Sequence, residues 1–210
     1  MNVELVEWQI RSEKNGLVYP WWSHPFLEVL EGWDLSDKFM LELGAGLGTA
    51  WLRDKCKWVD SVDASPEWAE RAEMYCQANG KVNGQISYEE IPDGVPGGWE
   101  RFKALIPDNV QYDVISVDGI YRYECIEWAL EHFKGRGGIV IVDNWQQDYV
   151  FISPKAEELM SGHVANKFVQ PNHTNHDGRP WNTRYYKVPD RKSTRLNSSH
   201  SGESRMPSSA

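Results

Sequence analysis

A cluster of glycines after a short apolar segment is the clearest sign of chemistry in this sequence. Residues 39–43 are apolar apart from Glu42, and Gly44, Gly46 and Gly48 follow at alternating positions. Glycine lets the backbone turn sharply and approach a ligand where a Cβ atom would clash. The apolar run has the length of a buried strand. The pattern therefore predicts a strand that ends in a turn holding a nucleotide.

The spacing of these glycines distinguishes two kinds of nucleotide site. A dinucleotide-binding turn has the pattern Gly-x-Gly-x-x-Gly or Ala. Here Thr49 stands where the third glycine of that pattern would be, and Gly48 comes one residue earlier. The pattern is instead Glu-x-Gly-x-Gly-x-Gly, which resembles motif I of the class I S-adenosylmethionine-dependent methyltransferases. A turn of this kind without any ligand is the alternative.

An acid at the end of the next predicted strand supports a nucleotide ligand. Residues 58–63 end in Asp63, and Ser65 and Pro66 then suit the start of a helix. A carboxylate at this place can accept hydrogen bonds from both hydroxyls of a ribose. Asp60 fits that role less well because it lies inside the strand. The alternative is that Asp63 is a surface acid beside a helix start.

The resemblance to the methyltransferases implies S-adenosylmethionine as the cofactor. It also implies that the cofactor contacts the glycine turn and the ends of the following strands. The predicted cofactor-binding residues are Glu42, Gly44, Ala45, Gly46, Gly48, Asp63, Ala64, Glu90 and Asp118.

Polar residues follow the fourth and fifth predicted strands, at the edge where open α/β sheets bind their ligands. Asp118 comes after residues 112–117, and Asp143 and Asn144 come after residues 138–142. This pairing resembles the cation-dependent O-methyltransferases, in which an Asp and an Asp-Asn pair bind a divalent metal. The resemblance implies Mg²⁺ bound by Asp118, Asp143 and Asn144, where it would lower the pKa of an acceptor hydroxyl.

Two features separate this sequence from those metal-dependent enzymes. They usually carry a lysine near the metal, and none adjoins Asp118 or Asp143. Residues 118–125 resemble more closely a group of methyltransferase-like proteins with a Trp-rich N-terminal segment. The alternative to a metal site is that both carboxylates accept hydrogen bonds from loop backbone and line the methionine end of the cofactor site.

The predicted catalytic residues are Asp118, Asp143 and His24. Histidine titrates near neutrality, and His24, His173 and His176 lie in segments that are expected to overhang the site. A solvated loop is the alternative for His173 and His176.

Tryptophan is unusually frequent, with 11 in 210 residues. Those that fall where loops should meet the crevice are Trp21, Trp22, Trp145 and Trp181. Aromatic faces there would stack on a flat substrate or attract a cation, and packing is the alternative. Those expected to pack helices onto the sheet are Trp58, Trp68 and Trp128.

Strand and helix signals alternate along the chain, which favours an α/β sheet with crossover helices. Strands are expected at residues 39–43, 58–63, 85–90, 112–117, 138–142, 163–169 and 183–188. Helices are expected from residue 49 and at residues 66–79, 99–106, 121–133 and 154–161. The resemblance implies a Rossmann-like class I methyltransferase fold, with a mostly parallel seven-stranded sheet, helices on both faces and a C-terminal antiparallel hairpin.

Three regions are predicted along the chain. Residues 1–38 form an aromatic-rich N-terminal cap, and residues 39–189 form the methyltransferase domain. Residues 190–210 are serine-rich and cannot bury a core, so we interpret them as a disordered tail of non-native read-through.

Composition indicates a globular protein, with 40% apolar and 25% charged residues. No run approaches membrane-spanning length and the N-terminus lacks a secretion signal, so a cytoplasmic protein without a membrane partner is expected. Cys56, Cys76 and Cys125 match no zinc or disulfide framework and are expected to be buried thiols.

The net charge of −9 bears on the substrate. Phosphate backbones are bound by Lys and Arg clusters, and the predicted domain has none. Nucleic acid is therefore not expected as a partner, and a small-molecule acceptor is; the oligomeric state is left open. The predicted function is methyl transfer from S-adenosylmethionine to an O or N nucleophile. The alternatives are an NAD-dependent oxidoreductase, which the glycine spacing disfavours, and a non-catalytic cofactor-binding module.

Overall fold

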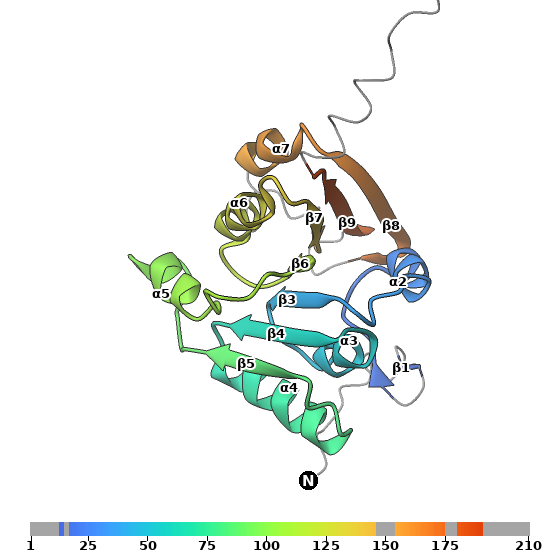
Figure 1. Cartoon of the computed structure of the whole chain (residues 1–210), viewed down its shortest axis with the longest axis vertical. Coiled ribbons are helices and arrows are strands. Elements are labelled where there is room, and N and C mark those ends of the chain that lie inside the picture. Colours follow the sequence, from blue (N-terminus) through green and yellow to red (C-terminus); the bar gives the residue numbers. More distant parts are fainter. Residues whose placement is uncertain (1–12, 15–16, 146–153, 175–179, 191–210) are drawn as a thin grey trace, which may run out of the picture.

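The computed structural model describes residues 13–14, 17–145, 154–174 and 180–190 (Figure 1). The strands of its main sheet are β3 (Phe39–Leu43), β4 (Trp58–Asp63), β5 (Gly84–Tyr88), β6 (Val114–Val117), β7 (Gly138–Val142), β8 (Val164–Thr174) and β9 (Pro180–Val188). They lie in the order β5-β4-β3-β6-β7-β9-β8. Neighbours are parallel from β5 to β7, and β9 is antiparallel to both β7 and β8. The predicted mostly parallel seven-stranded sheet with a C-terminal hairpin is confirmed.

Helices cover both faces of this sheet (Figure 1). One face packs against α2 (His24–Glu31), α3 (Thr49–Lys55) and α4 (Pro66–Ala78). The other packs against α5 (Gly98–Ala104), α6 (Arg122–Phe133) and α7 (Pro154–Met160). Successive side chains of a strand point to opposite faces of the sheet. Met40 therefore packs in the apolar cluster under α2, α3 and α4, while Leu41 and Leu43 pack in the cluster under α5, α6 and α7.

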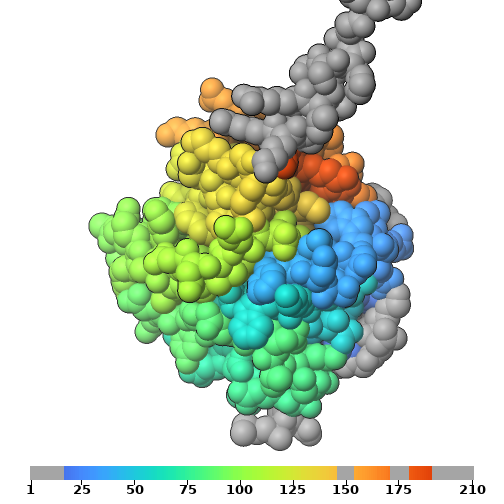
Figure 2. All heavy atoms as spheres, viewed as in Figure 1, coloured from blue at the N-terminus to red at the C-terminus, as the bar shows by residue number. Residues whose placement is uncertain are grey.

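The N-terminal segment contains elements that the sequence did not predict. Two-residue strands β1 (Glu13–Lys14) and β2 (Leu17–Val18) pair with each other, and α2 follows. Helix α2 begins after Ser23 with a proline in its first turn, and it buries Phe26, Leu27 and Leu30. In Figure 2 the blue part of this segment, which includes α2, lies against the red strand β9, and the Ser23 N–H donates to the Thr183 hydroxyl.

Parallel pairing brings the carboxyl ends of four strands to one edge of the sheet. Leu43 at the end of β3 is in register with Val62 of β4 and Val117 of β6, and Val117 is in register with Val142 of β7. The residues that follow these strands therefore lie side by side. The glycine turn and the strand-end acids come together here.

Three predictions concern the cysteines, membrane-spanning segments and the C-terminal tail. Cys56, Cys76 and Cys125 are free and buried, as expected. In the described ranges, no helix is long and apolar enough to cross a membrane. Residues 191–210, which hold almost all of the predicted tail, lie outside the described residues.

Candidate active site

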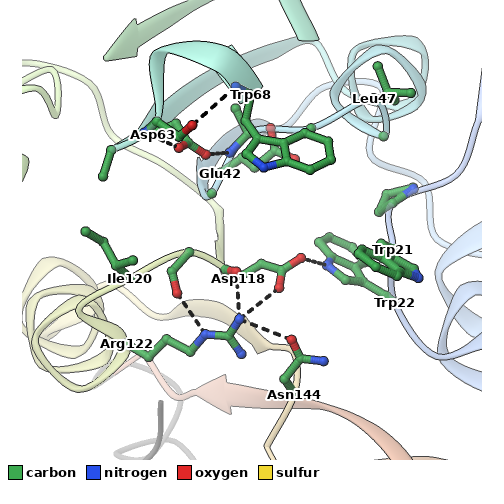
Figure 3. Close-up of a pocket in the computed structure, with 18 of the residues that line it drawn as sticks. Trp21, Trp22, Glu42, Leu47, Asp63, Trp68, Asp118, Ile120, Arg122 and Asn144 are labelled. Atoms are coloured by element: carbon green, nitrogen blue, oxygen red, sulfur yellow. Dashed lines mark hydrogen bonds and ion pairs between the residues drawn. The ribbon is translucent and has the colours of Figure 1, made fainter. Parts of the chain in front are cut away.

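A cavity of about 450 Å³ lies at the carboxyl edge of the sheet. Its walls come from the glycine turn, the ends of β4 and β6, and the N-terminal segment (Figure 3). The predicted cofactor-binding residues that line it are Glu42, Gly44, Ala45, Gly46, Gly48, Asp63, Ala64 and Asp118. Glu90 does not line the cavity, because its side chain is exposed and Ile91 lines the wall in its place.

The three glycines of the turn serve different purposes. Gly44 has a φ of +118°, and a Cβ atom there would lie 2.5 Å from the backbone nitrogen of Gly119, so this glycine allows the turn to touch the end of β6. A Cβ atom on Gly48 would overlap the backbone of Pro20. A Cβ atom on Gly46 would meet no atom within 4 Å. At Gly46 the missing side chain therefore leaves room that the protein itself does not fill.

Asp63 lies at the end of β4 and joins that strand to the glycine turn. Its Oδ2 accepts a hydrogen bond from the Ala45 N–H, and its Oδ1 accepts one from the Ser65 N–H, both at 2.7 Å. Burial raises the pKa of Asp63 to about 6, while these backbone donors lower it. The carboxylate is thus held at the cavity wall, where a ligand can also reach it.

Asp60, which the sequence placed inside the strand, lies in the protein interior, unlike Asp63 at the cavity wall. It is buried, and its carboxylate accepts hydrogen bonds from the Tyr112 hydroxyl at 2.8 Å and the Trp58 indole N–H at 2.6 Å. These bonds place Asp60 in the interior and away from the cavity.

Glu42 supports the turn from inside the sheet. Its Oε2 accepts hydrogen bonds from the hydroxyls of Thr49 and Ser61, both at 2.7 Å. The Thr49 hydroxyl in turn accepts the Gly46 N–H at 3.2 Å. Burial raises the pKa of Glu42 to about 7, although the two hydroxyls lower it. The residue that breaks the dinucleotide pattern, Thr49, therefore connects Glu42 to the open position of the turn.

Asp118 faces the cavity from the end of β6 (Figure 3). Its Oδ2 accepts a hydrogen bond from the Trp22 indole N–H at 3.1 Å, and its Oδ1 accepts one from Arg122 at 3.2 Å. Burial raises the pKa of Asp118 to about 6, and the Arg122 guanidinium lowers it. Neither Trp22 nor Arg122 had a role at Asp118 in the sequence prediction.

Arg122 lies at the first position of α6, and its guanidinium lies among the predicted metal ligands. Nε donates to the Gly119 carbonyl at 2.9 Å, and Nη2 donates to the Asp118 carbonyl at 2.7 Å. Nη2 also donates to Asn144 Oδ1 at 3.2 Å, and Nη1 donates to the Asp143 carbonyl. One side chain thus joins the ends of β6 and β7.

Asp143 does not face the cavity, in contrast to its predicted catalytic and metal-binding roles. It is buried, and its carboxylate accepts hydrogen bonds from the Thr183 hydroxyl and from the Trp181 indole N–H, the latter at 2.8 Å. Burial raises the pKa of Asp143 well above its usual range. Both oxygens are engaged by β9, so Asp143 ties that strand to the end of β7.

The residues present do not fit the predicted Mg²⁺ site of Asp118, Asp143 and Asn144. The Asp143 carboxylate points to β9, and the positively charged Arg122 guanidinium already binds oxygens of Asp118 and Asn144. Within the described part of the chain, no group of three or more His, Cys, Asp or Glu residues is placed to hold a metal ion.

The predicted histidine base is also not at the cavity. His24 begins α2 with its side chain exposed, its backbone N–H donates to Gln170 at 2.9 Å, and it is not among the cavity-lining residues. The side chain of His173 and all of His176 lie outside the described residues.

The tryptophans divide differently from the prediction. Trp21, Trp22 and Trp68 line the cavity, although Trp68 was expected to pack a helix onto the sheet. Trp145 is instead buried in the core against Tyr186. Trp181 contacts Trp21 edge to face, with ring centroids 5.2 Å apart.

Comparison with known proteins identifies the fold. No family model matches the chain, and no curated protein matches it by sequence. One similar solved structure is an S-adenosylmethionine-dependent methyltransferase from Methanosarcina mazei, with a TM-score of 0.53, 13% identity, and coverage of 77% of this chain and 97% of the other. The N-methyltransferase NodS from Bradyrhizobium japonicum has a TM-score of 0.51, 16% identity, and coverage of 80% and 98%.

An rRNA methylase from Streptococcus thermophilus is also similar, with a TM-score of 0.51, 14% identity, and coverage of 79% and 96%. These likenesses establish the predicted class I methyltransferase fold. They also correct the prediction of a small-molecule acceptor with nucleic acid excluded, which is wrong because this fold is shared with an rRNA methylase. Net charge describes the whole molecule and does not decide what a local surface binds.

Proposed function

We propose that this chain, which has the fold of the class I S-adenosylmethionine-dependent methyltransferases, binds that cofactor at the glycine turn and transfers its methyl group to an N or O nucleophile. The observation that carries the proposal is the open position at Gly46, on the wall of a cavity whose other walls supply acids and aromatic rings. Close packing against the protein explains Gly44 and Gly48, whereas the open space at Gly46 is what a bound ligand would require.

The ribose and the methionine part of the cofactor would each have chemically matching partners in the cavity. Asp63 would accept hydrogen bonds from the ribose hydroxyls, because a carboxylate is a strong acceptor. Glu42 and Asp118 would offset the positive charges of the methionine part, and the Trp22 and Trp68 rings are apolar walls that also attract cations. When bound, S-adenosylmethionine supplies an electrophilic methyl group on a positively charged sulfur.

The acceptor would lie at the side of the cavity formed by Asp118, Asn144 and Trp21. Trp21 lines the cavity and is 45% exposed, so its ring would stack on a planar group of the acceptor. Asp118, which lines the cavity here, would accept a hydrogen bond from the nucleophile. The protein's part in the reaction is mainly orientation and exclusion of water. Nucleic acid is among the acceptors that this proposal includes.

The N-terminal segment would close the site as a cap on the domain of residues 39–189. Pro20 packs against Gly48 of the turn, and Trp22 bonds to Asp118. The cap and the domain would therefore act as one unit when the cofactor binds.

Calorimetry with S-adenosylhomocysteine and with NADH separates this proposal from its alternatives. We expect saturable binding of S-adenosylhomocysteine and none of NADH. Binding of NADH alone would support an oxidoreductase. Binding of S-adenosylhomocysteine with no product formed across a screen of small-molecule and RNA acceptors would support a non-catalytic module.

A further inference from the structure

We propose that Arg122 is a built-in cation that orders the strand-end oxygens of this site, in the place that a divalent metal takes in cation-dependent enzymes, and that it positions Asp118 and Asn144 toward the acceptor. The positioning part rests on the proposed function, whereas the replacement of a metal does not.

The contacts of Arg122 are those of a central cation. Its guanidinium has five N–H donors in a rigid planar fork. Nε donates to the Gly119 carbonyl and Nη1 to the Asp143 carbonyl, while Nη2 is shared among the Asp118 carbonyl, the Asp118 carboxylate and the Asn144 amide oxygen. The side chain is 4% exposed. All of these acceptors are oxygens that come from two neighbouring strand ends.

Two residues next to the Arg122 guanidinium contacts, Tyr121 and Asn144, have an unusual backbone conformation. Tyr121, directly before Arg122, has a φ of +52°, and Asn144 has a φ of +53°. Residues other than glycine seldom adopt this left-handed conformation, and where they do the surrounding structure holds them there. The turn at Tyr121 starts α6 with Arg122 at the carbonyls, and the turn at Asn144 brings its amide oxygen to the guanidinium.

A metal ion would compete with Arg122 for the same oxygens. Hard divalent cations bind carboxylate, amide and carbonyl oxygens, which are the groups that the guanidinium already holds. The positive charge of Arg122 would also repel a divalent cation bound to the same oxygens. Removal of the guanidinium would leave these oxygens facing one another without a counter-charge. Arg122→Ala should therefore create a metal site that the natural protein lacks.

The same contacts fix how Asp118 and Asn144 meet the cavity. The two Asp118 oxygens are held separately, Oδ1 by Arg122 and Oδ2 by Trp22. Since Asn144 Oδ1 accepts from Arg122, its amide N–H₂ group points away from the guanidinium. Both residues line the cavity, so an acceptor would meet a carboxylate and an amide donor in fixed orientations.

Binding of Mn²⁺, followed by electron paramagnetic resonance, tests the replacement. We expect the wild-type protein to bind no Mn²⁺ at millimolar concentration and Arg122→Ala to bind one ion saturably. Adding Asp118→Asn to Arg122→Ala should abolish that binding. The matched control is Arg53→Ala, which removes an equally buried arginine that bonds to Glu73 and the Lys81 carbonyl outside the cavity. This control should gain no Mn²⁺ site.

Rescue by free guanidinium separates positioning from mere packing. At about 20 mM, too little to denature a folded domain, guanidinium ion should raise the melting temperature of Arg122→Ala by several degrees and restore its affinity for S-adenosylhomocysteine. Sodium at the same concentration should do neither. A folded Arg122→Ala protein that responds to neither Mn²⁺ nor guanidinium would overturn the proposal.

If Arg122→Ala does not fold, Mn²⁺ binding by the wild-type protein still tests the proposal. Mn²⁺ bound by the wild type, and lost in Asp118→Asn, would show that a metal displaces the arginine and would overturn the proposal; no binding supports it. Failure of the wild type to bind S-adenosylhomocysteine would instead count against the proposed function and leave the Mn²⁺ result to judge Arg122.

Discussion

The indole N–H of Trp22 donates a hydrogen bond to the carboxylate of Asp118 at 3.1 Å, across 96 positions of the chain. This bond joins the N-terminal segment to the end of β6 at the wall of the cavity. Trp22 is buried and its bond to Asp118 is partly buried, so loss of this bond leaves a carboxylate at the cavity wall without one of its donors. The segment before the sheet is thus part of the site.

Trp22→Phe keeps an aromatic ring and removes this donor. We expect it to lower the free energy of unfolding by about 1.5 to 3 kcal/mol, the usual cost of losing a hydrogen bond to a charged group. Denaturant unfolding measures the change. Trp21→Phe is the control, since Trp21 is 45% exposed and should lose less than about 1 kcal/mol. Equal losses in the two variants would mean that the Trp22 bond contributes nothing specific.

Asp63→Ala and Asp60→Ala should separate binding from stability. We expect Asp63→Ala to weaken the binding of S-adenosylhomocysteine by about 1.5 to 3 kcal/mol, because ribose hydroxyls lose a charged acceptor. Asp60→Ala should instead lower stability, because it leaves Tyr112 and Trp58 without their acceptor, and should leave affinity nearly unchanged. Calorimetry and thermal melting of both proteins check this. If both substitutions weaken binding equally, Asp63 is not the ribose acceptor.

The buried Glu42 should make stability depend on pH. Its pKa rises from an ordinary value of 4.5 in the unfolded chain to about 7 in the folded protein. Between these values the folded state binds more protons, so stability contributed by Glu42 is present below pH 4.5 and is lost as the pH rises to 7. The loss is on the order of 3 kcal/mol.

Denaturant unfolding of the wild type and Glu42→Gln from pH 4.5 to 8 isolates this contribution. Gln cannot ionise, so the wild type should lose stability relative to the variant as the pH rises. Glu67→Gln, which changes an exposed carboxylate, should follow the wild type. Parallel curves for the wild type and Glu42→Gln would show that Glu42 does not titrate in this range.

The central strands could be predicted from the sequence because buried parallel strands are short continuous apolar runs. Strands β3, β4 and β7 occupy the predicted residues. Helix α2 was missed, since eight residues give little helical periodicity. Strand β8 continues past residue 169 to Thr174, and β9 begins before residue 183 at Pro180. These added residues are mostly polar, and they form strand because each strand pairs with the other, which their own sequence does not indicate.

The site could be predicted only as far as strand ends determine it. Asp63 and Asp118 lie at the cavity because parallel strands end at the same edge. Asp143 has the same position along its strand, yet its side chain turns to Thr183, a contact set by the distant strand β9. The contact of Arg122 with Asn144 depends on two left-handed residues, which the sequence does not mark.

Gly46→Val gives the most direct test of the central claim that the open position of the turn is shaped for S-adenosylmethionine. A Cβ atom at Gly46 meets no protein atom, so the variant should fold with the melting temperature of the wild type. Its branched side chain would occupy the cavity and should weaken S-adenosylhomocysteine binding by more than about 2 kcal/mol. Gly44→Ala, by contrast, should lose stability because its Cβ would overlap Gly119.

The decisive measurement is the shift in melting temperature that S-adenosylhomocysteine produces in wild-type and Gly46→Val protein. A stabilising shift that is present in the wild type and absent in a folded Gly46→Val protein is the result expected here. An unchanged shift in Gly46→Val would contradict the claim that the cofactor lies against this glycine.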